Sequence, residues 1–153
     1  MKKFIKVSII VFILLVFIYL SFNFFVFGNT YYENDLEAIN ANLGVSVNVD
    51  SVIYKYENKK QEFFIIEDTT GEWWLGHLNK RKNSLYQFRE MTMFGPNYHA
   101  SDWYHEGSFK YTIVKEQDDF SKFDCGNKEP ICTEINYFGK NNHQLKGYIY
   151  LIE

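Results

Sequence analysis

The residues best suited to chemistry lie in one short segment, GPNYHASDWYHEG, at positions 95–107. Imidazole and carboxylate groups bind divalent metals and transfer protons. If the segment is a helix bounded by its proline and its glycine, three such groups share one face, namely His99, Asp102 and Glu106. If it is extended, His99 and His105 share a side and both acids point the other way. The metal hypothesis therefore depends on a helix.

Aromatic rings give the same segment a second interpretation, as an ordered loop that offers a contact surface. The residues of this candidate surface are Tyr98, His99, Asp102, Trp103, His105 and Glu106. The doublet Trp73-Trp74 lies on a predicted strand, so one ring faces each side of the sheet and one of them belongs to the core. The other, together with Trp103, would suit sugar rings or a protein partner. The alternative is that these rings simply fill an aromatic-rich core.

The familiar catalytic and cofactor motifs are absent from the sequence. It has no glycine-rich phosphate loop, no H-E-x-x-H, no EF-hand pattern and no nucleophile elbow. The aspartates of the segment 116–124 do not have calcium-loop spacing, and the basic triplet at 80–82 is typical of a solvated turn. We therefore expect no cofactor and no catalytic residues, and we favour a binding protein over an enzyme.

The N-terminus has the pattern of a membrane anchor. Residues 7–27, VSIIVFILLVFIYLSFNFFVF, contain no charged side chain and follow three lysines within residues 1–6. As a helix, 21 residues span about 30 Å, the thickness of the hydrocarbon core of a bilayer. The lysines before the segment place residues 1–6 in the cytoplasm and residues 29–153 outside. Cleavage as a signal peptide, which would make the protein secreted, is the alternative, although the run is longer than usual and lacks a good cleavage site.

Residues 29–153 are long enough for one domain with its own core. This part carries 19 acidic and 13 basic side chains, a formal charge of −6. Domains that bind nucleic acid are usually basic, so we expect no nucleic-acid partner. The abundance of Asn, Lys, Ile, Phe and Tyr is typical of bacterial proteins from AT-rich genomes.

The two cysteines, Cys125 and Cys132, lie in DCGNKEPIC, on the predicted outer side. An even number of cysteines in an oxidising compartment favours a disulfide that closes a small loop. A zinc pair is the alternative, but no second pair of ligands follows at finger spacing.

The order of the elements predicts a mainly-β (α+β) domain behind the transmembrane helix. NDLEAINANLG has a helical period with Asn34 and Glu37 at capping-box spacing, and Val45, Val47 and Val49 then alternate as in a strand. A break is expected at residues 50–52. Further strand-like runs recur between turn signals, with one or two helical turns near residues 116–124. Short connections predict one antiparallel sheet of about six or seven strands with a short leading helix.

The sequence thus indicates a small single-pass membrane protein with an extracytoplasmic binding or accessory module at the cell envelope. Its partner would be a membrane or envelope protein. Two alternatives stay open. One is a metal-assisted envelope hydrolase that uses the segment from His99 to Glu106. The other is a binder of envelope carbohydrate that uses Trp103 with Trp73 or Trp74.

The anchor makes a direct prediction. An epitope placed at the N-terminus should remain on the mature protein, and the protein should stay in the membrane pellet after an alkaline carbonate wash, because residues 7–27 are retained. Immunoblotting of both fractions measures this. Loss of the epitope from the mature protein would show cleavage instead.

Overall fold

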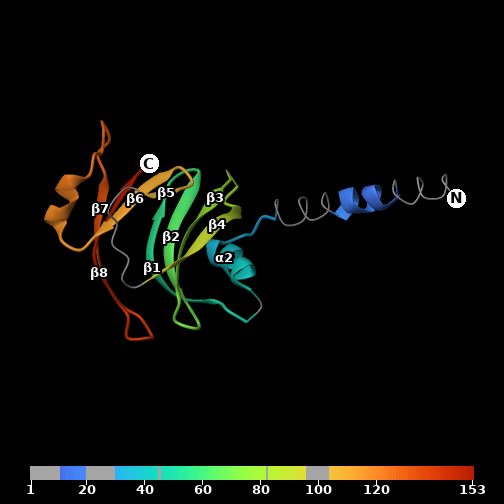
Figure 1. Ribbon diagram of the computed structural model, residues 1–153, viewed down its shortest axis with the longest axis horizontal. Helices are drawn as coiled ribbons and strands as arrows, with labels where there is room; N and C mark the ends of the chain where they lie inside the picture. The colour runs from blue at the N-terminus through green and yellow to red at the C-terminus, as the bar shows by residue number, and fades with distance from the viewer. Residues whose placement is uncertain (1–10, 20–29, 45, 82, 96–103) are drawn as a thin grey trace. The chain divides into compact units, whose positions relative to one another are not determined.

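The computed structural model describes residues 11–19, 30–44, 46–81, 83–95 and 104–153 (Figure 1). The chain divides into two compact units, Met1–Tyr31 and Tyr32–Glu153.

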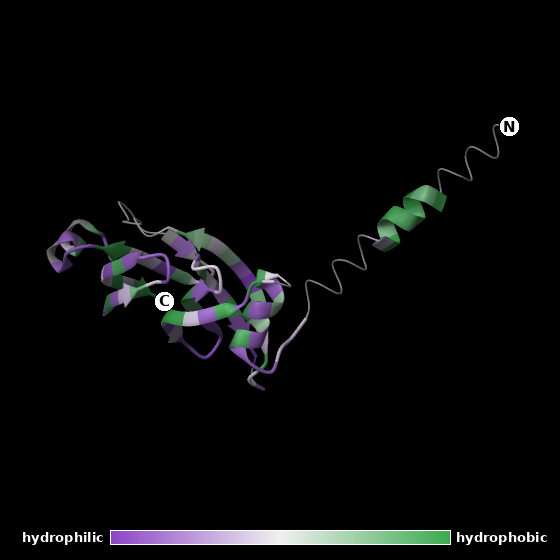
Figure 2. Cartoon of the chain, turned by 90° about the horizontal axis from the view of Figure 1, so that it is seen from below, coloured by the Kyte–Doolittle hydropathy of each residue, from purple (hydrophilic) through white to green (hydrophobic). Residues whose placement is uncertain are grey.

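In the first unit, residues 11–19 are α-helical and almost uniformly hydrophobic (Figure 2). The predicted transmembrane segment, residues 7–27, extends on both sides beyond these described residues. Within the described part of the chain, no helix combines the length and the apolar character needed to cross a membrane.

The second unit is mainly β, with two antiparallel four-stranded sheets and a short leading helix. The first sheet has the order β1-β2-β3-β4 and the second the order β5-β6-β8-β7. The elements are α2 (Asp35–Leu43), β1 (Val49–Glu57), β2 (Gln61–Asp68), β3 (Trp73–Lys80), β4 (Tyr86–Phe94), β5 (Tyr104–Glu106), β6 (Phe109–Val114), the 3-10 helix η1 (Gln117–Lys122), β7 (Ile131–Phe138) and β8 (Gln144–Ile152).

The expectation of an antiparallel mainly-β domain with a leading helix is confirmed, but the expectation of a single sheet of six or seven strands is wrong. The segment after β4 does not continue the pairing, and β5 opens a new sheet with β6. In that sheet β8 lies between β6 and β7, so the connection from β6 to β7 crosses over one strand position. Local alternation predicts strands but carries no information about which sheet each one joins.

The predicted helix forms where its capping signal places it. The side chain of Asn34 accepts a hydrogen bond from the backbone N–H of Glu37 at 2.7 Å, as an N-cap residue does. Ala38 and Ile39 are buried against the first sheet, whereas Leu36 is exposed. The strand predicted from Val45 begins only at Val49. The expected break is present, as register shifts after Val49 and again after Val52.

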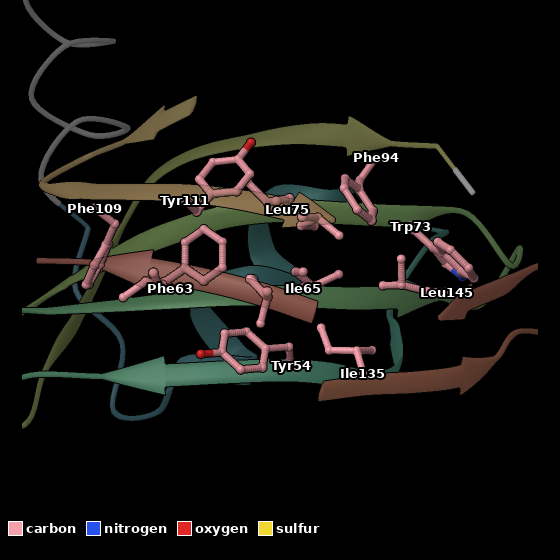
Figure 3. Close-up of a cluster of buried hydrophobic side chains, with 13 residues drawn as sticks. Tyr54, Phe63, Ile65, Trp73, Leu75, Phe94, Phe109, Tyr111, Ile135 and Leu145 are labelled. Carbon is pink, nitrogen blue, oxygen red and sulfur yellow. The ribbon is translucent and has the colours of Figure 1, made fainter. Parts of the chain in front are cut away.

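The main core lies between the two sheets, which contribute alternate residues of their strands (Figure 3). Phe63 of β2 is at its centre, with its ring 5.9 Å from that of Phe109 and 5.2 Å from that of Tyr111 across the sandwich. Edge-to-face and tilted contacts of this kind add to the burial of apolar surface. The fully buried rings and aliphatic chains hold the two sheets face to face.

A second cluster lies on the outer face of the first sheet, under α2. Phe64, Ile66 and Leu78 of the sheet pack against Ala38 and Ile39 of the helix. Strand β2 is therefore apolar on both faces, which explains its continuous run FFII.

The ends of the sandwich differ. At the end containing the β2–β3 turn (residues 69–72) and the β7–β8 turn (residues 139–143), the buried carboxylate of Glu67 joins the sheets; we call this the Glu67 end. The carboxylate accepts hydrogen bonds from Trp73 Nε1 at 3.1 Å, the Tyr137 hydroxyl at 2.9 Å and the backbone N–H of Lys140 at 2.9 Å. These donors come from β3, β7 and the β7–β8 turn, so one side chain connects both sheets.

The Glu67 end requires glycine at position 139. A Cβ added there would lie 2.4 Å from Glu67 Oε1 and 2.9 Å from Trp73 Nε1. We predict that Gly139→Ala lowers the free energy of unfolding by about 2 kcal/mol, because the carboxylate has to move from its donors. Urea unfolding followed by near-UV circular dichroism measures the change.

Gly95→Ala is the matched control, since a Cβ at Gly95 has none of the described atoms within 4 Å. It should change the free energy of unfolding by less than about 0.5 kcal/mol. Equal stability of the two variants would contradict the close approach at Gly139.

Candidate functional site

The segment 95–107 is only partly described by the structure. Tyr98, His99, Asp102 and Trp103 lie outside the described residues, so their placement in the candidate contact surface stays a prediction. Residues 104–106 form β5, and Gly107 follows with φ of 62° in the turn to β6. The helix considered for the whole segment is therefore wrong for this part, because antiparallel pairing with β6 holds residues 104–106 in extended conformation. Glu106 thus has no helical face to share with Asp102.

His77 and His143 are separated in the fold. His77 is buried on β3 beneath the β5–β6 turn, where a Cβ at Gly107 would lie 2.7 Å from His77 Nε2. His143 packs edge-on against Trp73 at the Glu67 end, with ring centroids 5.9 Å apart. Trp73 and His77 are four residues apart on one strand, or about 13 Å. Among the described residues, no three histidine, cysteine or acidic side chains are grouped closely enough to hold a metal ion.

The tryptophan doublet divides between the two faces of the first sheet, as its alternation predicts. Trp73 is 1% exposed in the main core and donates its indole N–H to Glu67. Trp74 is half-buried on the side of α2, and its Nε1 donates to Asp68 Oδ2 at 2.7 Å. Only Trp74 of the two could contribute to a contact surface.

Both cysteines are free thiols, so the predicted disulfide is not formed in this structure. Cys132 is exposed near the start of β7, and half-buried Cys125 follows η1, its Sγ 3.8 Å from the carbonyl oxygen of Phe123. The bond between them remains a proposal for the protein in an oxidising compartment.

A cluster of ionisable groups lies between the first turn of α2 and the first sheet. Lys55 Nζ of β1 is 2.5 Å from Asp35 Oδ2 and 3.6 Å from Glu62 Oε2 of β2. Glu62 is fully buried, and neither of its oxygens has a hydrogen-bond partner among the described residues. A buried carboxylate without donors is expected to favour its neutral form.

The pKa values of the two carboxyl groups in this cluster shift in opposite directions, that of Glu62 upward and that of Asp35 downward. Desolvation raises the pKa of Glu62 to about 7, and the negative charge of Asp35 adds to the rise while Lys55 opposes it. Burial alone would also raise the pKa of Asp35, but hydrogen bonds from Lys55 and from the N–H of Leu36 outweigh it and lower that pKa. Glu62 is thus a group that changes charge near neutral pH inside the fold.

Sequence reasoning missed Glu62, although a signal for it was present. The run FFII that follows it indicates a strand buried on both faces, so an acid at its start is buried whichever way it points. The partners Lys55 and Asp35 could not be foreseen, because they depend on the pairing of β1 and on the docking of α2.

The end of the sandwich opposite to Glu67 carries basic residues and two open recesses. It comprises the β1–β2 turn (residues 58–60), the β3–β4 turn (residues 81–85) and the β5–β6 turn (residues 107–108), and we call it the basic end. One recess of about 650 Å³ is lined by Lys59 and Lys60 and also by Glu57 and Glu153. The other, of about 380 Å³, is lined by Lys110 and Lys128 and also by Asp124 and Glu153. His105 also faces the smaller recess, the one residue of the predicted surface whose side chain the structure describes.

A row of apolar side chains crosses the outer face of the first sheet. The strand register aligns Val52 with Ile66, Ile66 with Trp74 and Trp74 with Met93. In the middle of this apolar row, Ile66 is fully buried and Trp74 is half-buried. At its ends, Val52 is 46% exposed and Met93 59% exposed. Its members are Val52, Ile66, Trp74 and Met93.

Neither protein-family models, nor curated proteins, nor solved structures gave a match to this chain.

The raised pKa of Glu62 gives a pH-dependent stability. The folded state binds this proton more tightly than the unfolded state, whose carboxyl has its ordinary pKa near 4.5. The contribution is therefore fully present below about pH 4.5 and is lost as the pH rises through 7. We predict that the free energy of unfolding falls by on the order of 3 kcal/mol across this window.

Urea unfolding at pH 5 and pH 8 measures this fall. Glu62→Gln should remove most of it, because the amide does not ionise. Glu134→Gln, at an exposed position of β7, is the control and should keep the fall of the unaltered protein. The same pH dependence in all three proteins would show that another group is responsible.

Proposed function

We propose that residues 29–153 form an extracytoplasmic binding module, held at the outer surface of a bacterial cell membrane by residues 7–27, and that it engages a protein partner. The observation that carries this proposal is the apolar row on the first sheet. Val52 and Met93, at its two ends, expose about half of their surface to water. Apolar area that leaves water on binding contributes about 25 cal/mol per Å².

Trp74 gives the row the character of a protein-binding surface. Its ring is half-buried and its indole N–H is already bound to Asp68, so the exposed part of the ring is available for apolar contact. Rigid aromatic side chains beside aliphatic ones are the usual anchors of protein interfaces. The flanking α2 supports the row from one side and fixes the positions of its inner members.

The candidate contact surface of the sequence analysis follows this row in the sequence. Met93 is two residues before Gly95, where the segment with Tyr98 and Trp103 begins. A partner with an exposed apolar patch fits the row better than an acidic or a basic ligand.

Photo-crosslinking in the native membrane tests the proposal. A photoreactive residue at position 93 should give a discrete adduct with one protein. The same residue at position 146, on the outer face of β8, should not. In chains that also carry Val52→Ser, the yield from position 93 should fall at least fivefold, because the row loses its second exposed end.

Ile131→Ser is the matched control for that substitution, since Ile131 is an exposed aliphatic residue of the other sheet. The yield from position 93 should be unchanged in this control. Adducts of the same mass and yield from positions 93 and 146 would contradict a specific surface.

A further inference from the structure

The two sheets have four edge strands, namely β1, β4, β5 and β7, and three of them are protected against pairing with another chain. Strand β1 has two register shifts, and β4 has one and is also bridged at Tyr86 by Tyr32. Strand β5 has only three residues. Bulges, covering segments and short strands of this kind keep an edge from acting as a template for a further strand.

Strand β7, the fourth edge, has none of these protections. All eight of its residues, from Ile131 to Phe138, pair with β8 without a register shift. Its sequence, ICTEINYF, contains no proline and no basic residue, and Glu134 is its one charged side chain. Within the described part of the chain, β8 is the only strand that pairs with β7. The opposite side of β7 is therefore open to a further strand.

The turn after β7 shows which of its backbone groups face away from β8. The N–H of Gly139 donates to the carbonyl oxygen of His143 at 2.8 Å, so the backbone of residue 139 faces β8. Backbone groups alternate in direction along an antiparallel strand. The N–H and C=O groups that point away from β8 thus belong to the even-numbered residues of β7, and all four of these residues are exposed. They are Cys132, Glu134, Asn136 and Phe138.

These four residues also place their side chains on the outer face of the second sheet, because Ile135 and Tyr137 between them pack into the main core. Phe138 is 69% exposed, the largest exposed fraction among the described large apolar side chains of the second unit. Cys132 is exposed near the other end of the strand. The outer face of β7 is therefore apolar at its ends and polar in its middle.

This order of side chains is complementary to itself in one antiparallel register. If Ile135 faces Ile135 of a second copy, Glu134 lies opposite Asn136 of that copy, and Phe138 lies opposite Cys132. The aromatic ring then covers a small apolar side chain, which is a favourable kind of cross-strand pair. Each of these contacts occurs twice because the pairing is symmetric.

Charge distinguishes this register from its neighbours. Lys146 of β8 is paired with Asn136 on the same face, so the carboxylate of Glu134 from a second copy also approaches a lysine. A shift by two residues in one direction would place the two Glu134 side chains opposite each other, and like charges in that position are destabilising. The same shift in the other direction would place Phe138 opposite Glu134.

We propose that β7 is a homodimer interface, at which two copies of this chain pair antiparallel with Ile135 facing Ile135. The second sheets of the two copies join into one continuous sheet. Its four pairs of outward residues form two hydrogen bonds each, about eight in total. The interface lies on the other sheet from the apolar row, so it adds a second contact to the proposed function and does not depend on it.

Disulfide crosslinking of the full chain in detergent tests the register. In a Cys125→Ser background, Phe138→Cys places a thiol opposite the native Cys132 of the second copy. The two Cα atoms would be about 5.5 Å apart, which a disulfide spans. Within one chain the same two thiols are about 20 Å apart along the strand and cannot bond. Oxidation with copper phenanthroline in air should convert at least half of the chains to covalent dimers on a non-reducing gel.

Asn136→Cys in the same Cys125→Ser background is the matched control. It also gives two exposed thiols on β7, but the proposed register places neither of them opposite a thiol. Less than a tenth of this variant should become a covalent dimer. Equal yields from the two variants, or a higher yield from Asn136→Cys, would overturn the proposed pairing.

Charge substitutions test the same contact without added cysteines. Asn136→Lys places a lysine opposite Glu134 of the second copy and should lower the dimer Kd at least threefold. Asn136→Glu places a carboxylate there and should raise the Kd at least fivefold. Asn83→Lys and Asn83→Glu make the same charge changes at an exposed position of the β3–β4 turn and should leave the Kd unchanged.

Sedimentation equilibrium in density-matched detergent measures the Kd, and near-UV circular dichroism checks that each variant keeps the packing of Trp73. An unaltered protein that stays monomeric at every concentration would overturn the homodimer, and β7 would then be an edge for another protein or for none. A dimer that responds equally to the substitutions at positions 136 and 83 would also overturn it, because its interface would lie elsewhere.

Discussion

A single buried carboxylate fixes how the two sheets of this domain face each other. A carboxylate inside a protein needs donors for its oxygens, and it is stable there only where the fold supplies them. Glu67 of β2 receives one donor from its own sheet, Trp73, and two from the other, the hydroxyl of Tyr137 and the N–H of Lys140. Sliding one sheet over the other would remove the donors Tyr137 and Lys140 and leave the buried carboxylate only Trp73, a cost of several kcal/mol. The apolar core between the sheets is not directional, so this polar contact supplies the registration that packing alone would leave loose.

The rest of the Glu67 end is built around the same contact. Asn141 donates to the carbonyl oxygens of Thr70 and Gly71, which joins the β7–β8 turn to the β2–β3 turn beside the carboxylate. At the other end the sheets meet through polar and more exposed groups, as where Gln61 accepts hydrogen bonds from Ser108. The Glu67 end holds the two sheets together, whereas the basic end and the outer face of the first sheet are open to contacts.

Much of the secondary structure could be predicted from the sequence, because its signals are local. The cap at Asn34, the run FFII of β2 and the turns between strands are short-range patterns with a direct physical cause. The division into two sheets could not be predicted, since it depends on pairings between residues far apart, such as Thr133 with Ile149. The candidate site shows the same limit. The alternation of Trp73 and Trp74 correctly predicted that they lie on opposite faces of the sheet. The helix considered for residues 95–107 is wrong at residues 104–106, because these residues pair with β6. The cluster around Glu62 could not be predicted, because it forms only where α2, β1 and β2 meet.

Tyr32 forms an isolated antiparallel bridge with Tyr86 through two backbone hydrogen bonds, and this bridge determines how the domain responds to tension. It is the first hydrogen-bonded point of the second unit, so tension that arrives along the chain from residue 31 loads these two bonds before any other part of the domain. Two bonds worth about 1 kcal/mol each yield early. The load then passes to α2, whose detachment would uncover Phe64, Ile66 and Leu78, while the core between the sheets stays intact. Under force the domain would therefore expose a new apolar face before the core between its two sheets unfolds.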